Sequence, residues 1–222
     1  FWHITSQGQS IFQGAYGDSK ADFGFSVVES MNNGYTILSL NRNISGIADS
    51  HIVIYNVDDN GGVVWSVKIG TNRNDYPVDI IQTSDGGYAV TGYTYGGLID
   101  TNTTDIFLLK TDDQGNPIFF KTFGGPDHEQ AHKILNSADG GFYIVGNTNG
   151  FGNGLTSALL IRTDNNGNQL WAKAIGTLDY TNFWSACLNH KGQILAGGTT
   201  YSTMNSIDDD FISLIDTNGN IL

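Results

Sequence analysis

Several kinds of residue are scarce in this chain of 222 residues. It has one cysteine, Cys187, so no disulfide can form within the chain. Charged residues make up 14% of the sequence, whereas about 25% is usual. Lys and Arg number 10 against 22 Asp and Glu, which gives a net charge of −12 and argues against a nucleic-acid partner. No apolar run reaches the roughly 18 residues of a membrane helix, and an aromatic content of 12% argues against disorder.

Only 3 prolines occur, but glycine is abundant at 29 residues, and many of these glycines recur at a fixed spacing. One series comprises the turn glycines Gly34, Gly87, Gly141 and Gly192, with spacings of 53, 54 and 51. A second series comprises Gly8, Gly61, Gly115, Gly167 and Gly219, with spacings of 53, 54, 52 and 52. Two interleaved landmarks with one period indicate a repeated structural unit.

Each unit predicts four short strands. In the second full unit they lie at Val78–Thr83, Tyr88–Tyr93, Ile106–Thr111 and Ile118–Phe123. β-branched and aromatic residues dominate these runs, and Gly-, Asn- and Asp-rich hairpin turns separate them. A period of about 50 residues with four antiparallel strands is typical of a β-propeller blade. The sequence therefore predicts an all-β protein, a β-propeller of four-stranded antiparallel blades.

The whole chain, 1–222, is interpreted as a single propeller domain or a fragment of one. Its expected units are 1–17 (partial), 18–70, 71–125, 126–177 and 178–222. Four blades and a partial one are therefore visible, and we expect them to belong to a larger ring. Cys187 falls on the first strand of the last unit, where we expect a small core residue.

The repeats resemble the Gly/Asp-rich propeller repeats of secreted bacterial surface proteins of the Bacteroidota type. The matching elements are the D-G-G-(Y/F) turn, the D-x-x-G-N turn, the aromatic residues Trp65 and Trp171, and the closing pair Gly124–Gly125. The resemblance implies secretion, by a type IX route, and a place on the cell surface. It implies a non-enzymatic binding, adhesion or interaction scaffold. The implied partner is another surface protein or a glycan, within a larger polypeptide or an outer-membrane assembly and without membrane insertion.

Ligand binding is predicted on the face that carries the longer loops. If both hairpin turns of a unit share one face, the loops Asn41–Ser50, Tyr95–Thr104, Asn147–Thr156 and Thr199–Asp210 share the other. Function often lies on variable loops that a rigid scaffold carries, and exposed aromatic rings suit sugars or protein surfaces. The candidate ligand-binding residues on this face are Tyr95, Phe151, Tyr180, Tyr201, Arg42 and Arg73.

Four acidic residues precede the first strands of the units and are expected around one mouth of the channel. They are Asp22, Asp75 and Glu129, each twelve residues before a turn glycine, and Asp179, one residue out of that register. We expect each carboxylate to cap its own turn through backbone N–H groups. Ca²⁺ binding is an alternative, since hard cations take oxygen ligands. A sugar-acting enzyme, or its accessory module, built on these acids is the alternative function, and a purely structural spacer is a third.

The segment from His128 to His132 reads H-E-x-x-H, a zinc motif when it lies on a helix. Here it enters a predicted strand, where the two histidines would lie about 13 Å apart at ~3.3 Å per residue. The spacing therefore argues against zinc, and the sequence predicts no catalytic residue, no metal site and no cofactor.

Overall fold

The computed structural model describes residues 2–4, 10–42, 50–71, 73–96, 102–152, 154–176, 179–204 and 206–222. The described residues contain strands and no helix, and therefore no helix that would cross a membrane. The strands are β1 (Trp2–Ile4), β2 (Ser10–Gln13), β3 (Ala21–Glu29), β4 (Tyr35–Arg42), β5 (Ser50–Val57), β6 (Val63–Ile69), β7 (Asp75–Gln82), β8 (Tyr88–Tyr95), β9 (Thr104–Thr111), β10 (Pro117–Phe123), β11 (Glu129–Asn136), β12 (Phe142–Thr148), β13 (Ser157–Thr163), β14 (Gln169–Ile175), β15 (Tyr180–Leu188), β16 (Ile194–Ser202) and β17 (Ile207–Ile215).

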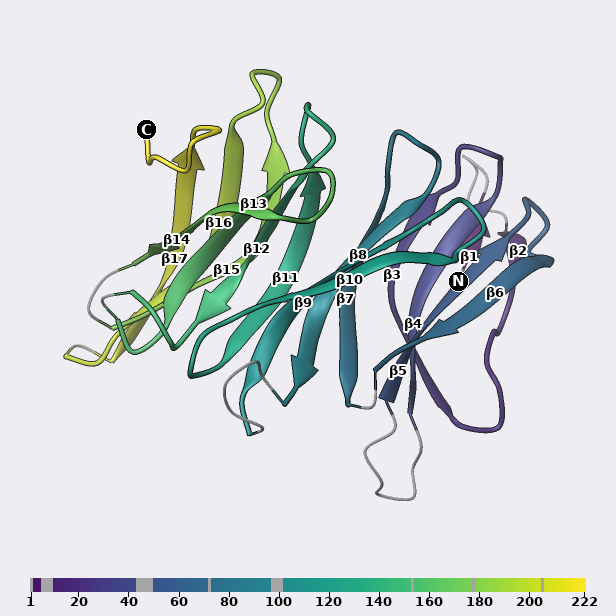
Figure 1. Ribbon diagram of the computed structural model, residues 1–222, viewed down its shortest axis with the longest axis horizontal. Helices are drawn as coiled ribbons and strands as arrows, with labels where there is room; N and C mark the ends of the chain where they lie inside the picture. Colours follow the sequence, from purple (N-terminus) through teal and green to yellow (C-terminus); the bar gives the residue numbers. More distant parts are fainter. Residues whose placement is uncertain are drawn as a thin grey trace.

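The strands form separate antiparallel sheets that follow one another in a row (Figure 1). A two-stranded sheet, β1–β2, comes first. Unit 1 is the sheet β3–β6, unit 2 is β7–β10, unit 3 is β11–β14, and unit 4 is the three-stranded sheet β15–β17. The all-β prediction and its four-stranded antiparallel sheets are confirmed, and the sheets have the form of propeller-like blades. In unit 4 an isolated antiparallel bridge joins Ile215 of the third strand to Ile221.

The first strand of unit 2 begins three residues before its predicted start, at Asp75. In unit 4 the predicted loop Thr199–Asp210 is wrong, because β16 and β17 occupy most of it. The antiparallel ladder continues through the pairs Thr199–Asp210 and Tyr201–Asp208. Pairing with the Thr- and Tyr-containing end of β16 thus extends β17 into aspartates that have little strand propensity of their own.

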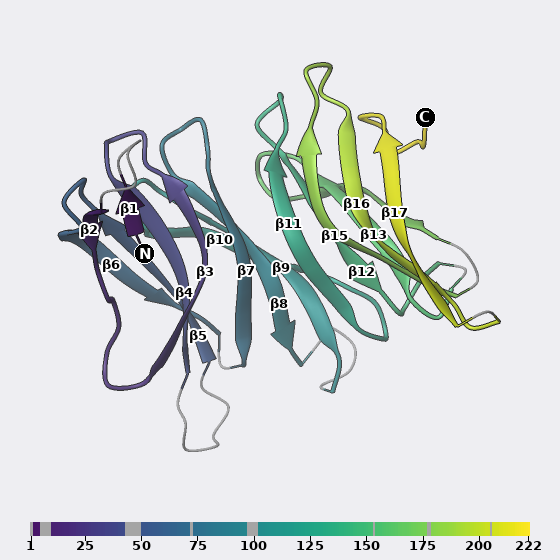
Figure 2. The ribbon, with the colours of Figure 1, turned by 180° about the vertical axis from the view of Figure 1, so that it is seen from behind.

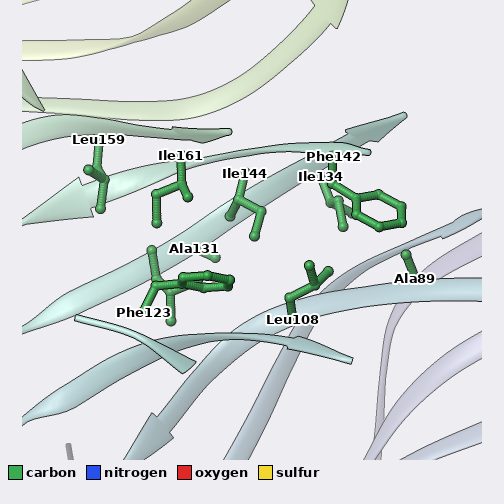
Figure 3. Packing of buried hydrophobic residues seen from close by; sticks show 10 residues of the cluster. Ala89, Leu108, Phe123, Ala131, Ile134, Phe142, Ile144, Leu159 and Ile161 are labelled. Carbon is green, nitrogen blue, oxygen red and sulfur yellow. The ribbon is translucent and has the colours of Figure 1, made fainter. Parts of the chain in front are cut away.

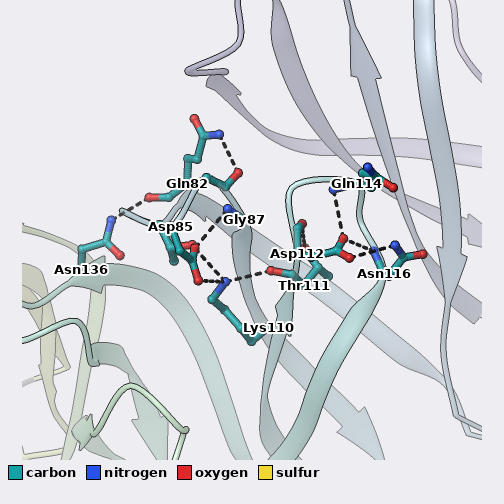
Figure 4. Close-up of polar contacts among 11 residues, drawn as sticks. Gln82, Asp85, Gly87, Lys110, Thr111, Asp112, Gln114, Asn116 and Asn136 are labelled. Carbon is teal, nitrogen blue, oxygen red and sulfur yellow. Dashed lines mark hydrogen bonds and ion pairs between the residues drawn. The ribbon is translucent and has the colours of Figure 1, made fainter.

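The turns between third and fourth strands form as predicted. Gly61, Gly115, Gly167 and Gly219 have φ values of 82°, 83°, 72° and 80°, in the left-handed region that glycine tolerates best. An aspartate caps each of these turns from its first position. In unit 2, for example, Asp112 Oδ1 accepts hydrogen bonds from the N–H groups of Gln114 (3.0 Å) and Asn116 (2.8 Å), as Figure 4 shows.

In the turns between first and second strands of units 2 and 3, the left-handed residue lies one position before the predicted turn glycine. In units 2, 3 and 4 the left-handed residues of these turns are Gly86, Gly140 and Gly192, and in unit 1 both Asn33 and Gly34 are left-handed. Gly192 therefore corresponds to Gly86 and not to Gly87, which restores a spacing of 52 to the last unit. Gly87 is required for another reason, since a Cβ there would overlap the carbonyl oxygen of Thr111.

The core lies between consecutive units. Figure 3 shows Leu108 and Phe123 of unit 2 facing Ile134 and Phe142 of unit 3. Similar clusters join units 1 and 2 and units 3 and 4. The aromatic residue of each fourth strand packs onto the next unit, as Trp65 does with its ring 5.9 Å from Tyr88.

Cys187 does not lie in the predicted core position, because it is exposed. It does lie on the first strand of unit 4, β15, as expected. Its side chain belongs to the face of unit 4 directed away from unit 3, and no described sheet covers that face.

Candidate binding site on the first strands

The first strands of the units are neighbours along the row: β3 contacts β7, β7 contacts β11, and β11 contacts β15 (Figure 2). In each unit the pairing of first and second strands shifts at the same place. The residue passed over by the pairing is Phe25, Val78, His132 or Trp184. These are β-bulges, which bend a strand and redirect a side chain. We call these four residues the bulge row.

Glycines in the second strands mark these bulges in the amino-acid sequence, but they were not used to predict them. Gly92, Gly146 and Gly198 lie opposite the bulges in units 2, 3 and 4. A Cβ at these positions would overlap the carbonyl oxygens of Tyr76, Gln130 and Asn182, respectively. An isolated glycine within a strand often marks a bulge or a close backbone approach, and here it marks both.

Trp184 and His132 form the most chemically distinctive part of the bulge row. Their ring centroids lie 4.6 Å apart, although they belong to different units. The Trp184 side chain is 51% exposed, and its indole Nε1 donates a hydrogen bond to Thr199 Oγ1 at 3.1 Å. An exposed indole with a fixed orientation provides a flat apolar surface that a ligand can stack on.

Two amides complete this cluster. Asn147 Nδ2 lies 3.2 Å from His132 Nε2 and donates a hydrogen bond to Asn182 Oδ1 at 3.0 Å. Burial lowers the pKa of His132, so the imidazole is neutral near pH 7. Since the amide of Asn147 donates, Nε2 accepts and the imidazole proton resides on Nδ1. The cluster therefore combines the flat indole ring of Trp184 with uncharged polar groups.

Asp79 lies one residue beyond the bulge in unit 2 and connects three units. Its Oδ1 accepts a hydrogen bond from Ser26 Oγ of unit 1 at 2.9 Å. Its Oδ2 accepts the backbone N–H of Ile134 at 3.1 Å and pairs with Lys133 Nζ at 2.9 Å. Asp79 is only 5% exposed, so this residue holds the surface together rather than presenting a free carboxylate.

Tyr95, a predicted ligand-binding residue, ends strand β8 and is 43% exposed. Its ring lies 5.7 Å from that of Tyr76, which stacks on Tyr93 at 5.3 Å. Burial raises the pKa of Tyr93. These three tyrosines form an aromatic cluster at the long-loop end of unit 2, and the sequence analysis identified only one of them.

The other predicted ligand-binding residues are scattered over several units. Tyr180 and Tyr201 face each other across β15 and β16, with ring centroids 5.9 Å apart. Phe151 follows β12 and lines a small cavity of about 90 Å³ together with Glu129. Arg42 is exposed at the end of β4, and Arg73 is exposed between β6 and β7, close to Gly96. Tyr180 and Tyr201 thus form one direct pair, Arg73 lies near the end of β8 that carries Tyr95, and Phe151 and Arg42 lie elsewhere.

The acids Asp22, Asp75 and Glu129 each accept a hydrogen bond from the backbone N–H four residues earlier. The donors are Asp18 (3.0 Å), Thr71 (2.6 Å) and Gly125 (2.8 Å). Asp75 and Glu129 are fully buried. Burial raises the pKa of Glu129, and the nearby charge of Asp105 raises it further. The carboxylates therefore serve as caps of the links between units.

The fourth acid, Asp179, is not in the corresponding place. Strand pairing puts Thr181 opposite Thr200, just as Glu129 lies opposite Thr148. Asp179 lies two residues before Thr181, outside the strand, and accepts a hydrogen bond from Thr203 Oγ1 at 2.7 Å. The predicted offset of one residue followed from aligning Gly192 with Gly87.

The two histidines of the H-E-x-x-H segment have different neighbours. His128 precedes β11, and its Nδ1 lies 3.2 Å from Thr104 Oγ1, whereas His132 faces Trp184 and Asn147. Within the described residues, no group of three or more His, Cys, Asp or Glu side chains is arranged to hold a metal ion.

Comparison with known proteins leaves the family open. No family model matches the chain, and no curated protein matches it either. Among solved structures, it is similar to a crystal structure from Bifidobacterium bifidum s17, of a protein with the provisional name exo-beta-1,3-galactanase. The TM-score is 0.57 at 14% identity, with 96% of this chain and 77% of that chain covered. At this identity the similarity concerns the fold alone.

Proposed function

We propose that this protein is a secreted, cell-surface module of a propeller, and that it binds glycans through the bulge row without cleaving them. Trp184 is the observation that carries the proposal. It is a half-exposed indole on the first strand of unit 4, held by a hydrogen bond to Thr199 and in contact with His132. Sugar rings present apolar C–H faces that stack on such plates, while their hydroxyls bond to neighbouring amides.

The surroundings of Trp184 support a sugar over a charged ligand. Asn147, Asn182 and Thr199 supply uncharged donors and acceptors, and the lowered pKa of His132 keeps the imidazole uncharged. The solved structure with a galactanase name supports beta-1,3-linked galacto-oligosaccharides as the first ligands to test. The resemblance of the repeats to those of secreted surface proteins supports the location.

The alternative of a sugar-cleaving enzyme built on the acids at the ends of the units has less support. Glycosidases use two carboxylates roughly 5–10 Å apart that both reach the substrate. In this chain Asp75 and Glu129 are fully buried and bonded to backbone N–H groups. Hydrolysis of the same oligosaccharides is nevertheless a direct assay of this alternative.

The test compares Trp184→Ala with wild type for binding to immobilised glycans that include beta-1,3-galactan fragments. We expect a loss of affinity of about twofold to tenfold, since aromatic stacking contributes ~0.5–1.5 kcal/mol and 1.4 kcal/mol is tenfold. The matched control is Ile118→Ala, which removes a residue that is 58% exposed on the fourth strand β10. It should leave binding unchanged.

Thermal unfolding of both variants checks that the fold is intact. Absence of glycan binding by wild type, or unchanged binding by Trp184→Ala, would reject the proposal. Binding that is lost only on changing Asp113 would place the site at the opposite end of the units. There a groove of about 450 Å³ lies between units 1 and 2 and is lined by Asp58, Asp59 and Asp113.

A further inference from the structure

A strip of uncharged side chains runs from the Trp184 cluster across units 3 and 2. It consists of the residue two positions before each bulge and the second-strand residue that pairs with it. In units 2, 3 and 4 these pairs are Tyr76 with Tyr93, Gln130 with Asn147, and Asn182 with Thr199. Every member of these pairs is partly exposed, whereas the next residue of each first strand, Pro77, Ala131 or Phe183, is buried. We call these three pairs the polar strip.

Hydrogen bonds connect the polar strip between units 3 and 4. Asn147 Nδ2 donates to Asn182 Oδ1 at 3.0 Å. The bulge residue of each of these units contacts the strip as well. His132 Nε2 lies 3.2 Å from Asn147 Nδ2, and Trp184 Nε1 donates to Thr199 Oγ1 at 3.1 Å. The polar strip and the bulge row therefore form one surface in these two units.

The polar strip continues from unit 3 to unit 2 by the same strand register. Strand β8 contacts β11 just as β12 contacts β15, so Tyr93 occupies in unit 2 the place that Asn147 occupies in unit 3. Its counterpart across the units is Gln130, which corresponds to Asn182. The strip therefore extends over three consecutive units, and none of its residues carries a charge near pH 7.

Aromatic rings are exposed at both ends of the polar strip. At unit 4 the side chain of Trp184 is 51% exposed. At unit 2 the side chain of Tyr95 is 43% exposed, and its ring lies 5.7 Å from that of Tyr76, which stacks on Tyr93 at 5.3 Å. The amides of unit 3 lie between these two groups of rings. This spacing suits a ligand longer than one sugar, whose C–H faces stack on the rings and whose hydroxyls bond to the amides.

We infer that the glycan site extends along the polar strip from Trp184 to the tyrosine cluster of unit 2, and that it takes a neutral, unbranched oligosaccharide of several sugar residues. This inference rests on the proposed function and adds the length and charge of the ligand. The ligand is unbranched because the strip is a single row of positions. Asp79 and Lys133, which follow the bulges of units 2 and 3, pair with each other at 2.9 Å. The net charge of −12 repels anionic polysaccharides, so the chain that binds is neutral.

The experiment measures by isothermal titration calorimetry how tightly a disaccharide and a hexasaccharide of beta-1,3-linked galactose bind. Wild type should bind the hexasaccharide about twofold to tenfold more tightly, because the longer chain gains a second aromatic contact. Tyr95→Ala should remove this gain and leave the affinity for the disaccharide unchanged, whereas Trp184→Ala should weaken the binding of both. Tyr95→Phe, which keeps the ring, and Ile118→Ala on β10 outside the strip are the controls and should bind like wild type.

The outcomes distinguish the length of the site from its existence. No binding of either sugar by wild type, or no loss in Trp184→Ala, rejects the proposed function and this inference with it. Equal affinity of wild type for both lengths, or a length dependence that Tyr95→Ala leaves unchanged, overturns the inference alone. Tighter binding of a hexasaccharide that carries carboxylates would overturn the neutral charge of the ligand. Tyr95→Leu takes the place of Tyr95→Ala if circular dichroism shows that the alanine variant is unfolded.

Discussion

At the scale of single residues, the glycines of this chain serve two separable purposes. Gly167 has a φ of 72°, and a Cβ there would lie 2.6 Å from Cε2 of Phe119. Gly192 has a φ of 74° but has free space around it, and Gly24 has free space and an ordinary φ. The three positions therefore separate the cost of a left-handed backbone from the cost of a steric clash.

We expect Gly24→Ala to change the free energy of unfolding by less than about 0.5 kcal/mol. Gly192→Ala should lower it by ~1–2 kcal/mol, the cost of a left-handed non-glycine residue. Gly167→Ala should lower it further, because the added methyl group meets the Phe119 ring. Urea unfolding of the three variants measures this order, and equal losses at Gly167 and Gly192 would contradict the packing role.

At the scale of secondary-structure elements, the turns between third and fourth strands depend on an ionised aspartate. Hydrogen bonds from the Asn168 side chain and backbone lower the pKa of Asp164. Hydrogen bonds from the corresponding residues, Asn116 and Asn220, lower the pKa of Asp112 and Asp216 in the same way. A carboxylate whose pKa is lower in the folded state stabilises that state above its unfolded pKa.

This stabilisation should therefore be complete above about pH 5 and should disappear as the pH falls below the unfolded aspartate pKa of about 3.9. We expect the triple variant with Asn at Asp112, Asp164 and Asp216 to be less stable than wild type near pH 7. The difference should shrink towards pH 3. Denaturant midpoints across this pH range measure it, and a difference that is constant with pH would be inconsistent with charged caps.

Asparagine is a suitable replacement because the chain already uses it in one turn. Asn189 Oδ1 accepts the N–H groups of Lys191 (2.9 Å) and Gln193 (3.0 Å) in the first turn of unit 4. The triple variant thus keeps the Oδ1 acceptor of each cap and removes its charge. The side-chain amide of Asn116, which donates to Asp112 Oδ2, must turn its oxygen towards the new amide, as Gln193 Oε1 accepts from Asn189 Nδ2 at 2.8 Å.

At the scale of the whole molecule, units 1, 2 and 3 are joined by apolar packing and by one buried carboxylate. Asp79→Ala would remove the acceptor of the Ile134 N–H group and the partner of Lys133. We expect a loss of about 2 kcal/mol or more, since an unsatisfied buried donor costs ~1–3 kcal/mol. Asp208→Ala, at an exposed position of β17, should change stability by less than about 0.5 kcal/mol.

Chemical denaturation of both variants tests this expectation. A loss at Asp79 no larger than that at Asp208 would show that the apolar clusters alone join the units. An unfolding transition that separates into two steps in Asp79→Ala would instead support the role of this residue between units.

The amino-acid sequence by itself determined the repeat, the all-β class and the turns between third and fourth strands, because these depend on local backbone demands. Gly115 and Gly167 are left-handed, and Asp112 and Asp164 cap the same turns from within four residues. Only the tertiary structure decided that Trp184, His132 and Asn147 meet, because they come from three strands in two units. Their meeting depends on a bulge in each first strand, and a bulge exists only relative to the strand that pairs with it. Exposure of Cys187 was decided in the same way, since burial depends on whether another sheet covers a face and not on the residue that the face carries.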